Sequence, residues 1–330
     1  MLTENVPWDF IVEQIDKKQC TPIISNHVVN DLLFGEPRLI SAWADRVRYP
    51  LADSANLTRV AQFHSVTLQD SIRAKSEYLA FLEYELLDLA ERDPKADQNF
   101  LRQVRRERRS LTFSQLATER LHYPNFKDDP QHPLTILANF DIPVYLTTSH
   151  HRFMEAALKA VGKTPHTEVY CWREDLEENI PAACKPDLNF EPDERSPLVY
   201  HLHGLDDYAD SLVLTEDDHL EFLVNVTRDF SRADVFPRKV RNAFTSSLLM
   251  LIGYELQGWD LRVLLQGLIR GKRHQKGIAV QLEHSQLSNV KHPQQFQEYL
   301  QNFFGLVKFD VYWGSPQNFL TTLWQAWNNI

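Results

Sequence analysis

Short apolar runs alternate with helical patterns along most of this chain, and this alternation restricts its fold more than any other feature. Because strands that are buried on both faces are almost continuously apolar, the pattern predicts a parallel sheet. The expected fold class is therefore α/β, a Rossmann-like parallel sheet with helices on both faces. The runs that we interpret as strands are residues 22–26, 142–148, 168–172, 198–202, 248–252, 277–282 and 307–312.

One long stretch interrupts this alternation. Residues from about 67 to 121 have helical apolar spacing nearly throughout and no strand pattern, and Asp93-Pro94 divides them into two helices. We therefore expect a single domain over residues 1–330, with a helical insertion at about 67–125. A polar stretch with four prolines, residues 177–197, is expected to form a long surface loop, and a lid is one interpretation of it.

The charge and the first residues of the chain limit its surroundings. The net charge of -10 argues against general binding to nucleic acid or to anionic membranes, because both require a basic surface. Residues 1–10 include Glu4 and Asp9 but no basic residue, unlike a signal peptide. No apolar run approaches the roughly 18 residues that a membrane helix needs. We therefore expect a cytoplasmic protein without a membrane partner.

Cysteine and glycine are both scarce, and this limits the metal sites and phosphate loops that the chain can form. The three cysteines, Cys20, Cys171 and Cys184, include no Cys-x-x-Cys pair, so neither a disulfide framework nor a zinc ribbon is indicated. Only 10 glycines occur in 330 residues, and only Gly35 and Gly162 precede Gly204. The first 200 residues therefore contain no glycine-rich phosphate loop.

Polar residues or glycines follow four of the predicted strands. In open parallel sheets, ligands bind beyond the carboxyl ends of the strands, so this rule selects four segments as the candidate site. They are Ser25-Asn26-His27, Thr148-Ser149-His150-His151, His203-Gly204 and Gly253-Tyr254.

The strongest individual signal is the segment Tyr200 to Gly204. On a strand, His201 and His203 would point to the same face, and Gly204 would permit a sharp turn after them. An imidazole at a strand end is suited to general-base catalysis near pH 7, which makes His203 the main catalytic candidate. Two other interpretations stay open: a hydrogen-bonded core histidine at a turn, and a His-x-His zinc site that would need further ligands.

Several segments, in this order, resemble the Sir2-like family, particularly its bacterial branch of NAD-consuming defence effectors. The family's Thr-Thr-Asn-Tyr-Asp element aligns with Thr147-Thr148-Ser149-His150-His151, and its His-Gly element aligns with His203-Gly204. The similarity extends over nearly the whole chain outside the predicted insertion. Further segments typical of the family are residues 211–218, Leu251 to Leu256 with Asp260-Leu261-Arg262, and Tyr312-Trp313-Gly314.

This resemblance implies an activity, NAD+ glycohydrolysis to ADP-ribose and nicotinamide, in anti-phage defence. NAD would be the substrate, His203 the general base, and Ser149 and His151 would position the ribose. Because the family keeps such activity silent until infection is sensed, a regulatory partner or a homo-oligomer is implied. The nucleotide-binding residues implied are Ser25, Asn26 and His27 at the diphosphate, with Thr148, Gly204, Gly253, Tyr254 and Asp260.

The sequence also departs from the family pattern at two elements. The family's Gly-Ala-Gly phosphate loop is replaced by Ser25-Asn26-His27, and its Asn and Asp are replaced by Ser149 and His151. Three scattered cysteines cannot build the four-cysteine zinc module of the deacetylases, so we expect neither zinc nor protein deacetylation. These replacements leave an alternative function, a catalytically degenerate nucleotide-binding sensor or scaffold subunit of a defence complex.

Overall fold

Within the part of the chain that the structure describes, seven parallel strands form one sheet in the order β3-β4-β2-β1-β5-β6-β7. The computed structural model describes residues 6–53, 56–93, 96–254, 259–269, 276–281 and 292–329. Each predicted apolar run is a strand, with its ends shifted by a few residues, and the α/β prediction is confirmed. The strands are β1 Cys20–Ile24, β2 Val144–Thr147, β3 His166–Val169, β4 Leu198–His201, β5 Leu248–Ile252, β6 Gly277–Gln281 and β7 Phe309–Trp313.

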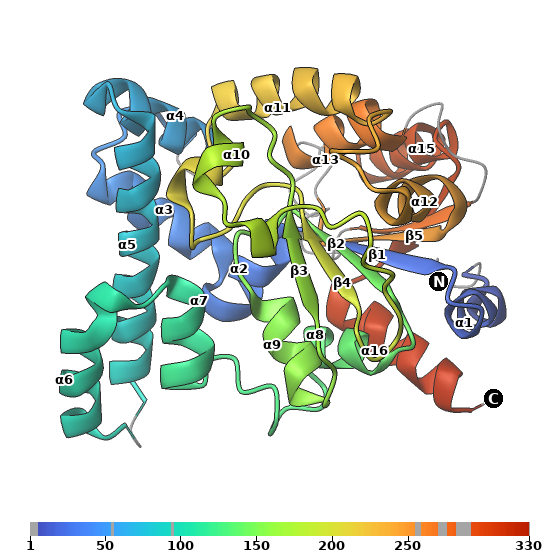
Figure 1. Ribbon diagram of the computed structural model, residues 1–330, viewed down its shortest axis with the longest axis horizontal. Coiled ribbons are helices and arrows are strands. Elements are labelled where there is room, and N and C mark those ends of the chain that lie inside the picture. The colour runs from blue at the N-terminus through green and yellow to red at the C-terminus, as the bar shows by residue number, and fades with distance from the viewer. Residues whose placement is uncertain are drawn as a thin grey trace.

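Helices cover both faces of this sheet (Figure 1). Alternate strand residues point to opposite faces, so Met250 and Ile252 join one buried cluster while Leu249 and Leu251 join the other. The first cluster is completed by α1 Trp8–Asp16, α8 Pro133–Asn139, α9 Phe153–Ala160 and α16 Pro316–Asn328. The second is completed by α11 Glu216–Asp229, α12 Arg238–Ser246, α13 Trp259–Leu264 with the π-helical turn η5 Leu265–Ile269, and α15 Pro293–Gly305.

Capping residues explain where two of the helices begin. The Ser25 hydroxyl accepts a hydrogen bond from the Val28 N–H and starts α2 (Asn26–Phe34) directly after β1. Thr215 and Asp218 form a capping box at the start of α11. In both helices the capping side chain accepts a hydrogen bond from a first-turn amide that would otherwise have no partner.

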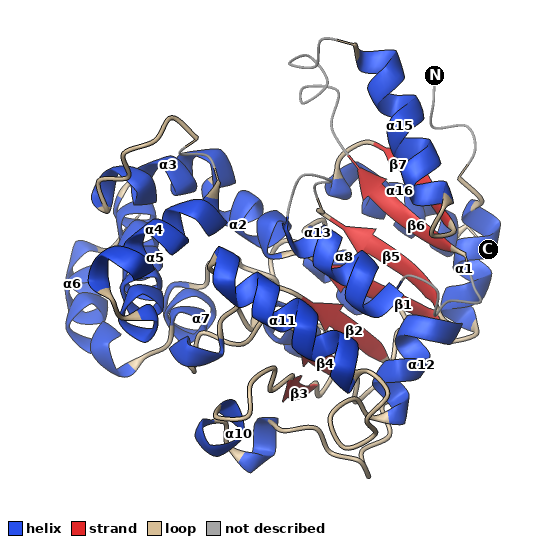
Figure 2. Ribbon diagram, turned by 90° about the horizontal axis from the view of Figure 1, so that it is seen from above, coloured by secondary structure: helices blue, strands red, loops and turns tan. Residues whose placement is uncertain are grey.

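The helical insertion contains α4 Leu57–Leu68, α5 Ser71–Glu91, α6 Gln98–Glu107, η1 Arg108–Ser110, α7 Phe113–Gln115 and the π-helical turn η2 Leu116–Leu121. The described residues between 67 and 121 include no strand, as expected, but the helical run already begins at Leu57. Together with α3 (Glu36–Arg46), these helices lie beyond the carboxyl ends of the strands (Figures 1 and 2). A buried ion pair of 2.8 Å, between Lys75 of α5 and Asp218 of α11, joins the insertion to the helices of the sheet.

The proline-rich stretch at 177–197 runs over the surface, as expected. It also contains short helical segments, which were not expected. It begins within α10 (Leu176–Asn179) and includes η3 (Ala182–Cys184). Its later part is fastened beside the edge strand β3, because the Lys239 ammonium donates to the backbone oxygens of Asp187 and Phe190. Within the described part of the chain, no helix is both long and apolar enough to cross a membrane.

Candidate functional site

The carboxyl ends of four neighbouring strands are aligned in the sheet. Ile24 of β1 is in register with Thr147 of β2 and Ile252 of β5, and Thr147 is in register with His201 of β4. The residues that follow these positions therefore emerge in one row along the carboxyl edge, the side of the sheet where the strands end.

Hydrogen bonds connect all four segments selected from the sequence. The Ser25 hydroxyl donates to the Gly253 oxygen at 2.6 Å, and the Thr148 and Tyr254 hydroxyls are 3.0 Å apart. The further bonds run from His150 N to Asn26 Oδ1 (3.3 Å), from His150 Nε2 to the Val213 oxygen (3.3 Å), and from Val213 N to the His203 oxygen (3.1 Å). The structure thus brings the four segments together.

The predicted site residues are also mostly inaccessible. His27 is half-buried in the first turn of α2. The side chain of Asp260 lies outside the described residues. The side chains buried to 6% exposure or less are Ser25, Asn26, Thr148, Ser149, His151, His203 and Tyr254.

Two glycines at this edge are required by packing within the chain itself. Gly204 has a φ of +83°, and a Cβ there would lie 2.2 Å from the Ser211 carbonyl oxygen. Gly253 has a φ of +77°, and a Cβ there would lie 2.4 Å from the Cβ of Val28. Both positions therefore exclude side chains. At Gly253, the adjacent space is filled by the first turn of α2.

The expectation that His201 and His203 share a face is wrong. The His201 ring lies 2.9 Å from a carboxylate oxygen of Glu155 on α9, whereas the His203 ring packs against His219 and Phe222 of α11, on the opposite face. The cause is the end of β4 at His201, after which the backbone bends and the strand alternation stops. The two imidazoles therefore do not form a His-x-His metal pair, and the described residues include no group of three or more potential metal ligands.

His201 has the contacts of a core histidine. Its Nδ1 donates to the Ser149 carbonyl oxygen at 3.0 Å, while its Nε2 faces Glu155. Burial by itself raises the pKa of the Glu155 carboxyl, but the neighbouring His201 and Arg152 outweigh it and leave that pKa below its usual value. His201 thus holds the backbone at Ser149 in place.

His151 is buried without polar contacts to its ring. The ring centroids of Phe113 and Phe153 lie 4.7 Å and 5.4 Å from that of His151, and neither ring nitrogen has a hydrogen-bond partner within the described residues. Burial, followed by the neighbouring His150 and His201, lowers the pKa of His151 well below its ordinary value. The imidazole is therefore neutral at pH 7.

Asp206 is a further buried group at this edge, and it was not predicted from the sequence. Its Oδ2 accepts from the Ser114 N–H at 2.6 Å, and its Oδ1 has no partner within the described residues. Burial raises the pKa of the Asp206 carboxyl to about 7, although the Ser114 hydrogen bond opposes this shift. Only its position two residues after Gly204 could have drawn attention to it, because Ser114 is 92 positions away in the sequence.

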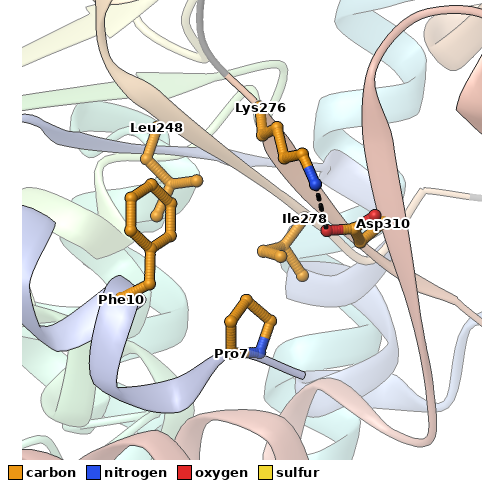
Figure 3. A pocket seen from close by; sticks show the side chains of 6 residues that line it. All are labelled: Pro7, Phe10, Leu248, Lys276, Ile278 and Asp310. Atoms are coloured by element: carbon orange, nitrogen blue, oxygen red, sulfur yellow. Dashed lines mark ion pairs between the residues drawn. The ribbon is translucent and has the colours of Figure 1, made fainter. Parts of the chain in front are cut away.

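A cavity of about 260 Å³ lies at the opposite, amino-terminal edge, where β5, β6 and β7 begin. Figure 3 shows its lining, which is mainly apolar, with one ion pair of 4.0 Å between Lys276 and Asp310. None of the predicted site residues lines it. The remaining lining residues are Pro7, Phe10, Leu248 and Ile278.

Cys171 follows the carboxyl end of β3 by two residues, and its thiol faces the Val169 oxygen. Burial raises the pKa of its thiol to about 11, so the thiol is protonated at neutral pH and is a poor nucleophile.

Comparison with known proteins identifies the part of the chain that includes three of the four strand ends. Residues 143–303 match a family model described as a SIR2-like domain. No curated protein matches the chain. The SIR2-like family includes NAD-dependent enzymes, which supports a nucleotide-related function. Residues 143–303 are therefore similar to a SIR2-like domain, in agreement with the resemblance of the chain's motifs.

Proposed function

We propose that this protein is an NAD+ glycohydrolase that cleaves NAD+ to ADP-ribose and nicotinamide at the carboxyl edge of the sheet. The observation that carries this proposal is the hydrogen-bonded convergence of four strand ends within one row of the sheet. In open parallel sheets this is the edge where nucleotides bind, and the SIR2-like match gives the nucleotide class.

His203 is the proposed general base. Nicotinamide leaves as positive charge develops on the ribose C1′, and an imidazole beside the ribose can remove a proton from a ribose hydroxyl or from the attacking water. Such proton transfer contributes about 10²–10⁴-fold to the rate. Gly204, which adopts a positive φ that other residues rarely take, forms the turn directly after His203 and so supports its placement.

The first turn of α2 is the proposed diphosphate site. Amide groups at a helix N-terminus attract anions, and Asn26 and His27 lie in that turn. The Ser25 hydroxyl is already bonded to Val28 N and to the Gly253 oxygen, so we assign it to holding the turn in shape. Ser149 and His151 are assigned to the ribose, and Thr148, Gly204, Gly253, Tyr254 and Asp260 to the surroundings of the nucleotide.

The burial of the site residues supports a regulated enzyme. At 6% exposure or less for most of them, a nucleotide reaches these side chains only after the covering segments move. A resting state of this kind suits an effector of anti-phage defence, which must stay silent until a trigger arrives. We therefore include a homo-oligomer or a regulatory partner protein, and a cytoplasmic location, in the proposal.

A second candidate function is a nucleotide-binding sensor or scaffold without turnover. It is favoured by the phosphate-loop region, where side chains replace the family's glycines and where Ser25 and Val28 fill the space beside Gly253. This packing leaves less room for a pyrophosphate than a glycine loop does.

Release of nicotinamide from NAD+ distinguishes the two functions. The purified protein is incubated with NAD+, alone and with lysate of phage-infected cells, and nicotinamide is quantified by chromatography. We expect His203→Ala to lose about 10²-fold or more of the activity. The control His64→Ala removes a histidine that is 9% exposed, within the insertion, and should remain active.

Each other outcome has a defined meaning. NAD+-dependent thermal stabilisation without nicotinamide release supports the sensor. Neither release nor stabilisation would contradict both functions. Full activity of His203→Ala would remove the proposed general base.

A further inference from the structure

His151 and Asp206 are two of the buried side chains at the carboxyl edge that have hydrogen-bonding atoms without a partner within the described residues. His151 is 2% exposed with both ring nitrogens unpartnered, and Asp206 is 7% exposed with Oδ1 unpartnered, within the described residues. Leaving buried polar atoms without hydrogen bonds is costly, so native proteins seldom do it without a functional reason. Three such atoms on two side chains of this edge point to a ligand that supplies the missing partners.

The contacts of Asp206 and His151 bring both residues to one part of the carboxyl edge. The Asp206 N–H donates to the oxygen of His150, the residue before His151, at 2.8 Å. The Asp206 carboxylate accepts from the N–H of Ser114, and the neighbouring Phe113 packs its ring on His151. Both side chains therefore lie beneath α7, the short helix of the insertion.

The chemistry of this pair suits a vicinal diol. A carboxylate accepts hydrogen bonds, and a neutral imidazole offers one donor and one acceptor. A diol has two hydroxyl groups that can donate to Asp206 and exchange hydrogen bonds with His151. A diphosphate does not fit, because the carboxylate would repel it. An acidic residue on ribose hydroxyls is also a recurrent solution in nucleotide-binding α/β folds.

We propose that Asp206 and His151 form a subsite beneath α7 that binds the hydroxyl groups of the ribose next to the reacting bond. The inference rests on the proposed function and extends it, because it adds Asp206 as a binding residue and gives the insertion a place in the site. Asp206 lies three residues after His203, in the segment that follows β4.

The charged surroundings of the subsite fit this assignment. Asp206 faces Asp207 and Arg152, and Arg152 is itself paired with Asp207 at 2.8 Å, so the nearby positive charge is already engaged. His151 faces His150 and His201. Ser114 also joins the two parts of the subsite, because its hydroxyl accepts from the Arg152 N–H at 2.9 Å.

Binding of ADP-ribose tests the subsite without turnover. Titration calorimetry would compare ADP-ribose with two analogues, one without the 2-hydroxyl of the terminal ribose and one without that of the adenosine ribose. We expect wild type to bind the terminal-deoxy analogue about tenfold more weakly. Asp206→Asn should bind ADP-ribose about tenfold more weakly than wild type and be insensitive to the missing terminal hydroxyl.

Two further variants complete the design. Asp210→Asn is the matched control, because Asp210 lies in the same segment but accepts a hydrogen bond from Asn179 on the surface, and it should bind ADP-ribose as wild type does. His151→Asn keeps a polar side chain and should show the same insensitivity as Asp206→Asn. Thermal melting confirms that each variant is folded.

Three results would overturn the inference. The first is that removal of the terminal 2-hydroxyl weakens binding by the same factor in wild type and in Asp206→Asn. The second is that Asp206→Asn binds ADP-ribose as tightly as wild type does. A penalty confined to the adenosine-deoxy analogue is the third, because it assigns the subsite to the other ribose. If wild type releases nicotinamide from NAD+, these results reject the subsite alone. If wild type neither binds ADP-ribose nor cleaves NAD+, the proposed function fails with it.

Discussion

The two edges of the sheet differ, because one has a mainly apolar cavity and the other has buried polar residues that are bonded to one another. The amino-terminal edge has a cavity of about 260 Å³ with a mainly apolar lining, and its ion pair, Lys276–Asp310, is exposed and 4.0 Å long. At the carboxyl edge, buried polar residues from four strand ends are bonded to one another. This cavity and the candidate site thus lie at opposite edges of the sheet.

This difference follows from the direction of the helices around a parallel sheet. In a parallel sheet the helices that follow the strands start at the carboxyl edge, so their N-terminal amide groups converge there and favour anionic ligands. The amino-terminal edge lacks that field. Buried polar groups are therefore better stabilised at the carboxyl edge than at the amino-terminal edge. The following substitutions measure how strongly the two edges differ.

The largest expected difference concerns the ion pairs at the two edges. Lys75→Met leaves the buried Asp218 without its cation, so the free energy of unfolding should fall by about 3–5 kcal/mol in urea denaturation. Lys75 and Asp218 have side-chain exposures of 1% and 7%. Lys276→Met removes a cation with 71% exposure and should change little. Equal effects would contradict the contrast between the edges.

Next in size is the effect of a single methyl group at two glycines. Gly204→Ala forces a Cβ against the Ser211 backbone at a φ of +83°, so we expect a loss of about 2–3 kcal/mol. Gly305 lies just before β7, at the amino-terminal edge, and a Cβ there meets no atom within 4 Å. Gly305→Ala should leave the thermal midpoint unchanged or raise it. A tolerated Gly204→Ala would show that the turn after His203 can adjust.

The strands were predictable because their signal is local, whereas parts of the candidate site were not. Leu248 to Ile252 is apolar without interruption, and β5 has these bounds. The helix α3 was not predicted, because Gly35-Glu36-Pro37 is typical of a turn, although proline is also compatible with a first helical turn.

The same limit applies to the site residues. The rings of His201 and His203 lie on opposite faces because the backbone bends after β4, and no residue pattern predicts that bend. The burial of Asp206 depends on Ser114, which only the folded insertion brings close. Which segments meet could be predicted from the sheet rule, but which atoms they leave unpaired could not.

The smallest expected effect is a pH dependence located at Asp206. Its pKa of about 7 in the folded chain lies above the ordinary value of 3.8, so the folded state binds more protons than the unfolded state between these values. Its contribution to stability is therefore present at low pH and is lost as the pH rises toward 7. Between pH 5 and 7 the free energy of unfolding should fall by about 2 kcal/mol relative to Asp206→Asn.

The difference in the free energy of unfolding between wild type and Asp206→Asn reports the titration of the Asp206 carboxyl and excludes that of His151, which both proteins contain. The lowered pKa of His151 has the opposite consequence, since stability falls as the pH drops below the unfolded value and the buried imidazole resists its proton. At the amino-terminal edge, Asp310→Asn leaves Asp206 in place and should keep the wild-type slope. Urea denaturation at pH 5, 6 and 7 gives all three slopes. Parallel curves for wild type and Asp206→Asn would mean that the Asp206 carboxyl is ionised throughout this range, and the polar contrast between the two edges would then be weaker than the geometry indicates.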